Sequence, residues 1–174
     1  MAARDRRTPP HLRQLVEDLR NPTGEPIRTA TLTFDGTPID YREHGDGPPL
    51  LLLPGGVGHA GVLDRLAAHL SGHHRVVSMS SRLVSARPGT QHGDLSPKTY
   101  AEDAVSLIDT LFDEPPIVFA FSAGAITTLE LLTRHPDRVR LAVVHEPLAL
   151  PCCPTPNATA PRSKPSGPPR APRT

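Results

Sequence analysis

Pro116-Ile117-Val118-Phe119-Ala120-Phe121-Ser122-Ala123-Gly124 is the stretch that decides the fold of this chain. Residues 116–121 form an uninterrupted apolar run, which predicts a buried strand, and Ala123 to Arg134 carries apolar residues at helical spacing. A serine therefore stands on a strand-to-helix turn. Small residues two positions before and after it allow the sharp turn of a nucleophile elbow, which holds the hydroxyl out at the end of the strand. The alternative is a serine that only caps a core helix.

Further strand and helix patterns flank this turn. Ile27 to Phe34 and Thr37 to Glu43 are joined by Asp35-Gly36, a pair that readily adopts positive φ, so a β-hairpin is predicted. The other predicted strands are 49–53, 75–79 and 139–144. Two further helices are predicted. The first buries Val62, Leu63, Leu66 and Leu70, and the second starts at Ser96-Pro97 and buries Ala104, Leu107, Ile108 and Leu111. Residues 80–95 are expected to form an irregular connection. Alternating strands and helices predict an α/β fold with a doubly wound, mostly parallel sheet.

Three regions are expected along the chain. Residues 1–26 form an N-terminal segment with a short amphipathic helix, and residues 27–149 form the core. Residues 150–174 are expected to be a disordered tail, because Pro151 to Thr174 holds eight prolines and four basic residues but no acid and no aromatic residue. Scattered basic residues among prolines are more typical of a solvated tail than of a nucleic-acid site.

Charge and composition exclude several classes of partner. The 19 lysines and arginines nearly balance the 18 aspartates and glutamates, so no overall field attracts nucleic acid or a membrane surface. A secretory signal and a run of roughly 18 apolar residues are both missing, and a soluble cytoplasmic protein is expected. Cys152 and Cys153 are adjacent, and neither they nor the histidines have metal-site spacing. We therefore expect no metal and no cofactor.

The order of these motifs resembles the α/β-hydrolase family. The hairpin, the Leu51-Leu52-Leu53-Pro54-Gly55-Gly56 loop, the serine turn and a strand that ends in His145-Glu146-Pro147 follow one another as in bacterial single-domain members. The resemblance covers residues 27–149, or about six of the eight strands of that fold. It implies a serine hydrolase for an ester- or amide-type small molecule, with Ser122 as nucleophile and the backbone N–H groups of Gly56 and Ala123 as the oxyanion hole. The alternative for the glycine run is a plain turn.

The sequence departs from the family pattern at several points. Ala120 and Pro54 stand where the family has glycine and histidine, and Ser80 to Ser85 stand where it has an Asp-Arg-x-Gly turn. The triad acid and base would follow the sixth strand, but no histidine follows His145, so the chain is expected to be a truncated or frame-shifted hydrolase.

Two histidines are candidates for the missing base. His135 lies ~18 Å from Ser122 along the predicted helix and is too far away. His145 ends a strand predicted to lie beside the elbow strand, which makes it the one candidate base. The alternative is a structural hydrogen-bonding residue, which is the more common role of a histidine at a strand end. Two functions stay open: a serine hydrolase, and a non-catalytic remnant or binding protein. Self-association through an unpaired strand at 139–144 is a further expectation.

Overall fold

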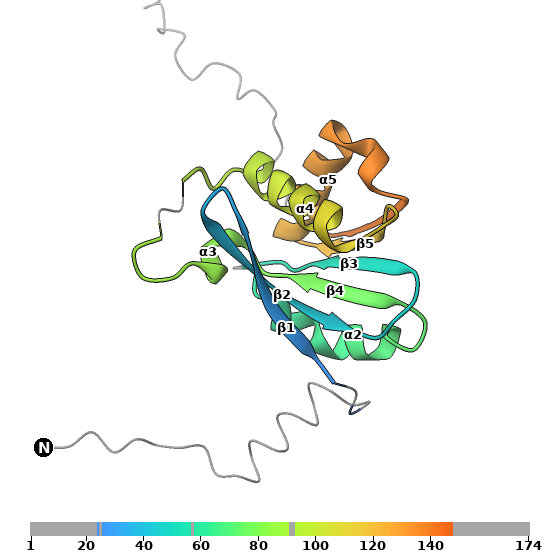
Figure 1. The fold of residues 1–174 in the computed structure, drawn as a ribbon. Coiled ribbons are helices and arrows are strands. Elements are labelled where there is room, and N and C mark those ends of the chain that lie inside the picture. Colours follow the sequence, from blue (N-terminus) through green and yellow to red (C-terminus); the bar gives the residue numbers. More distant parts are fainter. Residues whose placement is uncertain (1–23, 25, 57, 91–92, 148–174) are drawn as a thin grey trace, which may run out of the picture.

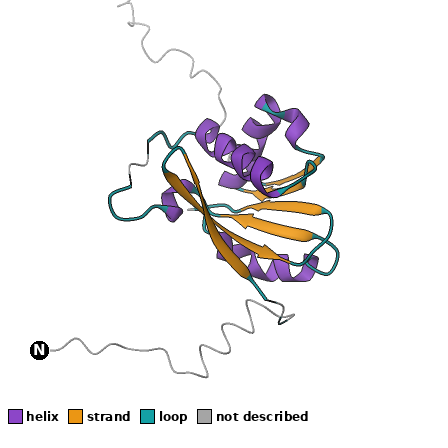
Figure 2. Cartoon of the chain, viewed as in Figure 1, coloured by secondary structure: helices purple, strands orange, loops and turns teal. Residues whose placement is uncertain are grey.

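The computed structural model describes residues 24, 26–56, 58–90 and 93–147, which form a six-stranded sheet with helices on both faces (Figure 1). The strands are β1 (Arg28–Phe34), β2 (Thr37–His44), β3 (Pro49–Leu53), β4 (Arg75–Met79), β5 (Ile117–Phe121) and β6 (Leu141–His145). The helices are α2 (Asp64–Leu70), α3 (Arg82–Ser85), α4 (Pro97–Leu111) and α5 (Ala123–Arg134), with 3-10 helices η1 (Ala60–Leu63) and η2 (Pro136–Arg138). Figure 2 shows the same elements by type.

The sheet has the order β1-β2-β4-β3-β5-β6. The four strands β4, β3, β5 and β6 are parallel, while β1 and β2 form an antiparallel hairpin that joins β4. Asp35 and Gly36 at the hairpin turn have φ of 49° and 75°, the two positive values that a type I′ turn requires. The predicted α/β fold with a mostly parallel sheet is confirmed.

Two hydrophobic cores lie on the two faces of the sheet. The core beneath α4 and α5 is the larger one and includes Leu51, Leu53, Val77 and Val118 from the strands. On the opposite face, α2 packs against Leu50, Leu52 and Val76. Figure 1 shows α2 on one side of the strands and α4 with α5 on the other. Helices on both faces are what a parallel sheet requires.

The start of α4 follows the predicted capping chemistry. The Ser96 hydroxyl accepts a hydrogen bond from the Thr99 N–H at 3.4 Å, and Pro97 occupies the first turn. The Asp94 carboxylate accepts hydrogen bonds from the Ser96 and Thr99 hydroxyls, which hold its pKa below the usual value. Ala104, Leu107 and Ile108 are buried as the helical spacing predicts.

Three details of the sequence interpretation were wrong. The connection 80–95 is not wholly irregular, since α3 forms there with Ser81 as its N-cap. Val62 is 62% exposed because η1, with three residues per turn, turns Ala60 and Leu63 inward instead. The strand β5 is fully buried on one face only. Val118 and Ala120 are buried, whereas Ile117, Phe119 and Phe121 on the other face are half-buried. The predicted N-terminal helix and the predicted tail lie outside the described residues.

Candidate active site

Ser122 lies at the turn between β5 and α5 in a conformation that residues with a side chain rarely adopt. Its φ is 53° and its ψ is −118°. The peptide groups around it are held on both sides, because the Ser122 N–H donates to the His145 carbonyl at 3.0 Å and the Ser122 carbonyl accepts from the Ala125 N–H at 3.1 Å. The Ser122 side chain makes no capping hydrogen bond to α5, which argues against the capping alternative. The ψ of −118° lies outside the left-handed helical region in which most non-glycine residues with positive φ fall, and such strained conformations cluster at functional turns.

Glycines on both sides of Ser122 allow the backbone to approach closely. A Cβ at Gly124 would stand 2.3 Å from the Leu53 carbonyl oxygen and 2.7 Å from that of Pro54, so α5 can begin against the end of β3 only without a side chain there. A Cβ at Gly55 would stand 2.9 Å from the Ser122 Cβ. The loop after β3 is therefore in direct contact with the serine turn.

The loop after β3 is also tied to the end of β4. The Gly58 N–H donates to the Gly55 carbonyl at 3.1 Å, which closes a turn around Gly56, and the Ser81 N–H donates to the Gly58 carbonyl at 2.7 Å. The buried Ser80 hydroxyl accepts a hydrogen bond from the Ala60 N–H at 3.0 Å. Gly56 has a φ of 59°, which only glycine adopts without strain. These bonds fix the loop that holds Gly56, one of the two residues whose N–H groups the family resemblance implies for an oxyanion hole.

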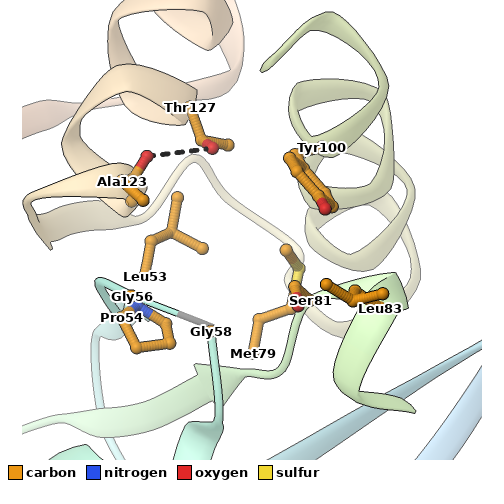
Figure 3. A pocket seen from close by; sticks show the side chains of 11 residues that line it. Leu53, Pro54, Gly56, Gly58, Met79, Ser81, Leu83, Tyr100, Ala123 and Thr127 are labelled. Atoms are coloured by element: carbon orange, nitrogen blue, oxygen red, sulfur yellow. Dashed lines mark hydrogen bonds between the residues drawn. The ribbon is translucent and has the colours of Figure 1, made fainter. Parts of the chain in front are cut away.

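A cavity of about 90 Å³ opens between this loop and the start of α5 (Figure 3). Its backbone walls include Gly56 and Ala123, the two residues predicted to form the oxyanion hole, together with Gly124. Its side-chain walls come from the ends of β3 and β4 and from the helices α3, α4 and α5: Leu53, Met79, Ser81, Leu83, Tyr100 and Thr127. The walls are mainly apolar, with Tyr100 and Leu83 across the cavity from Ala123 and Thr127. Ser122 thus stands next to a residue that lines a small apolar pocket.

The Tyr100 hydroxyl is the weakly acidic group on the wall of this cavity. Burial raises the pKa of Tyr100 above its usual value, and the nearby Arg82 guanidinium opposes that shift only in part. The phenol therefore stays protonated at neutral pH. It can donate a hydrogen bond to a ligand in the cavity.

An ion pair positions the α3 wall of the cavity. The Arg82 guanidinium donates from Nε and Nη2 to the two Asp103 carboxylate oxygens at 2.8 and 2.6 Å, and both side chains are largely buried. The hydrogen bonds that Arg82 donates to Asp103 raise the pKa of Arg82. Leu83 follows Arg82 directly, so this two-pronged contact between α3 and α4 holds Leu83 in the cavity wall.

The backbone of His145 lies beside the serine turn. It pairs with Phe121 in the register of β5 and β6, and its carbonyl accepts from the Ser122 N–H, as expected for strands that end at one edge of the sheet. Within residues 93–147, no hydrogen bond joins the His145 imidazole to the Ser122 hydroxyl. His135 caps the far end of α5, where its imidazole lies 3.2 Å from a Glu102 carboxylate oxygen, so it takes no part in the site.

Neither a metal-binding cluster nor a helix suited to crossing a membrane occurs among the residues that the structure describes. Those residues contain no cluster of three or more histidine, cysteine, aspartate or glutamate side chains that could hold a metal ion. None of the helices described here is long and apolar enough to cross a bilayer.

The sequence interpretation missed the walls of the cavity. Met79, Leu83, Tyr100 and Thr127 come from four elements, and their spacing along the chain carries no motif. One signal could have indicated the first two, because residues just after a parallel strand lie at the edge of the sheet where ligands bind in α/β folds. Tyr100 and Thr127 have no such signal, since each sits within an amphipathic helix.

Comparisons with known proteins agree with this architecture. The family model described as "alpha/beta hydrolase fold" matches residues 48–168. The chain is 34% identical over 125 residues to an uncharacterized hydrolase, YraK, of Bacillus subtilis (strain 168), and 33% identical over 127 residues to a zearalenone hydrolase of Cladophialophora bantiana. These matches cover 71% and 70% of this chain but 46% and 48% of the relatives, so the chain spans about half the length of the curated relatives it matches.

Solved structures give the same picture. A putative epoxide hydrolase from Pseudomonas aeruginosa superposes with a TM-score of 0.60 at 25% identity, covering 68% of this chain and 40% of that one. An E-2-(acetamidomethylene)succinate hydrolase superposes with a TM-score of 0.59 at 24% identity, covering 67% of this chain and 43% of that one.

Proposed function

Since the chain belongs to the α/β-hydrolase family, we propose that it acts on a small ester- or amide-type compound through nucleophilic attack by Ser122. The observation that carries this proposal is the backbone of Ser122, with φ 53° and ψ −118° between a strand and a helix. A serine without a catalytic task has no need of a strained turn, and strain of this kind costs of order 1–3 kcal/mol. The two close-contact glycines, Gly55 and Gly124, support the same interpretation.

The proposed reaction is acyl transfer. The Ser122 oxygen attacks the acyl carbon, the carbonyl oxygen becomes negatively charged, and the N–H groups of Gly56 and Ala123 stabilise that charge. The leaving alcohol or amine departs, and water later releases the acid from the acyl-enzyme. The cavity beside Gly56 and Ala123 receives the acyl portion.

The size of the cavity limits the acyl group. The cavity has a volume of about 90 Å³. Pockets for drug-sized ligands have about 300–1,000 Å³. We therefore propose a short, mainly apolar acyl group as the preferred substrate part, with Leu53, Met79 and Leu83 around it.

The base for Ser122 is the open part of the mechanism. A serine hydroxyl is a weak nucleophile without a neighbouring base. His145 is the proposed candidate within the described chain, because its backbone is already bonded to Ser122. The absence of a side-chain hydrogen bond between them, within residues 93–147, favours the second candidate function, which is a binding protein that keeps the pocket without turnover.

A fluorophosphonate probe separates the two functions. We expect intact-mass spectrometry to show one probe per chain, lost in Ser122→Ala and retained in Ser106→Ala, whose hydroxyl lies on α4 and bonds to the Glu102 carbonyl. If His145 is the base, His145→Ala slows labelling by about 10²-fold or more. Unchanged labelling in His145→Ala removes that residue from the mechanism but keeps Ser122. A wild-type chain that stays unlabelled while a short-chain amide still binds would establish the binding protein instead.

A further inference from the structure

A cluster of polar side chains lies in the core beneath α2. His44 of β2 pairs with Val76 of β4, which belongs to that core, so His44 lies on the face of the sheet that α2 covers. Arg42 and Ser78, two residues further along these strands, pair with each other and lie on the same face. Asp64, the first residue of α2, completes the cluster: its Oδ1 atom lies 2.8 Å from Arg42 Nε and 3.8 Å from His44 Nε2.

This cluster is an unfavourable arrangement for stability alone. The side chains of His44 and Asp64 are 1% and 2% exposed. Among the residues that the structure describes, the buried side-chain atoms without a hydrogen bond include Arg42 Nε, both ring nitrogens of His44, Asp64 Oδ1 and Ser78 Oγ. Apolar side chains in place of a buried ion pair are often as stable or more stable. What the pair of Arg42 and Asp64 provides is a fixed position for Asp64, because separating the two leaves a charge buried without its partner.

The fixed position of Asp64 matters for η1, which is held to the sheet at both ends. At its start, the Ala60 N–H donates to the buried Ser80 hydroxyl, directly after β4, at 3.0 Å. At its end, the Asp64 N–H donates to the Gly61 carbonyl, and the Asp64 carboxylate contacts Arg42 of β2. The two anchors come from different strands, so a shift or tilt of η1 stretches at least one of them.

We propose that Asp64 and Ser80 are positioning residues for the Gly56 N–H, and that they act through η1. This inference rests on the proposed role of Gly56 in hydrolysis by Ser122. The helix η1 begins four residues after Gly56, and the turn around Gly56 is closed by the Gly58 N–H, so a displaced η1 changes the direction of the Gly56 N–H. An oxyanion donor is effective only about 2.7–3.1 Å from the developing charge, so a small displacement is costly.

Amide hydrogen exchange in the full chain tests the positioning without reference to activity. Asp64→Asn and Ser80→Ala should each raise the exchange rate of the Gly58 amide, which closes the turn around Gly56, about five- to tenfold, because each removes one anchor. Ser71→Ala is the matched control, since its buried hydroxyl donates to a backbone carbonyl at the other end of α2, and it should leave Gly58 exchange unchanged. An unchanged Gly58 rate in both anchor variants, or an equal rise in Ser71→Ala, would overturn the proposal. Far-UV circular dichroism checks that each variant is folded.

Labelling kinetics with the fluorophosphonate probe test the consequence for Ser122. The maximal labelling rate of Asp64→Asn and Ser80→Ala should fall at least about tenfold, because the donor that stabilises the transition state moves. The probe concentration that gives half of the maximal rate should stay the same, because the pocket does not move. A purely structural role would change neither value in the folded protein. An unchanged maximal rate alongside faster Gly58 exchange would overturn the link to Gly56. An unlabelled wild type would instead contradict the proposed function, and the Gly58 exchange rates would still decide whether the two anchors hold the turn.

Discussion

Replacing Gly124 by alanine isolates the steric requirement of the serine turn from its chemistry. The new methyl group would stand 2.3 Å from the Leu53 carbonyl oxygen, about 1.1 Å inside the 3.4 Å at which ordinary contact begins. The atoms it meets belong to the backbone of β3 and the loop after it, so no flexible side chain can move away. Overpacking of this kind costs typically about 1–3 kcal/mol, and we expect a value near the upper end for Gly124→Ala.

Urea unfolding followed by circular dichroism measures this cost. A loss of about 3 kcal/mol corresponds to a fall in Tm of about 6–12 °C for a chain of this size. Gly72→Ala is the matched control, because its Cβ meets nothing within 4 Å and its φ is not positive; it should be neutral or stabilise by about 0.4–1 kcal/mol. Gly56→Ala, with open space but a φ of 59°, should fall between the two at about 1–2 kcal/mol. A Gly124→Ala protein within about 0.5 kcal/mol of Gly72→Ala would refute the close-approach argument.

Two further predictions concern ion pairs. Asp103→Asn should lower the free energy of unfolding by about 1.5–3 kcal/mol in urea titrations, because it removes the charge from a largely buried, two-pronged contact with Arg82. A loss no larger than that of the exposed control Asp137→Asn would contradict this. Burial tends to raise the pKa of Asp40, but hydrogen bonds from Arg87 and Thr31 outweigh burial, so the pKa is lower in the folded protein than in the unfolded chain. These contacts therefore stabilise the fold above the unfolded pKa of about 3.9. Their contribution is lost as the pH falls through the pKa that Asp40 has in the folded protein. Asp40 is half-buried, but its partner Arg87 is exposed and solvent screens the pair, so Asp40→Asn should cost at most about 1 kcal/mol at pH 7. Urea titrations should show this cost shrinking towards pH 3, and a cost that grows on acidification would contradict the sign.

The backbone plan was predictable from the sequence because it depends on local signals. The hairpin follows from Asp35-Gly36, the α4 start from Ser96-Pro97, and the serine turn from an apolar run that meets Ser122-Ala123-Gly124. Each signal acts within a few residues of the structure it produces. The resemblance to the motifs of the family then predicted the order of these elements along the chain.

The rest depends on packing between distant segments. The buried residues of α5 are Gly124, Ala125, Thr127, Thr128 and Leu131, whereas the apolar Leu129 is 43% exposed. The contact of Gly124 with β3 decides which face turns inward, and helical spacing alone does not show this. Likewise, the cavity walls and the contact between Arg82 and Asp103 join residues from separate elements, so no single segment of sequence specifies them.

The hydrogen bond from Ser122 to His145 makes the outermost described strand a support of the turn. A strained residue keeps its conformation only while its surroundings hold it, and here part of that restraint is the carbonyl of His145 at the end of β6. Local opening of β6 would release the Ser122 amide to solvent. Hydrogen exchange at that one amide therefore reports how often β6 detaches, and the fraction of time that the proposed nucleophile keeps its turn depends on how often this five-residue strand opens.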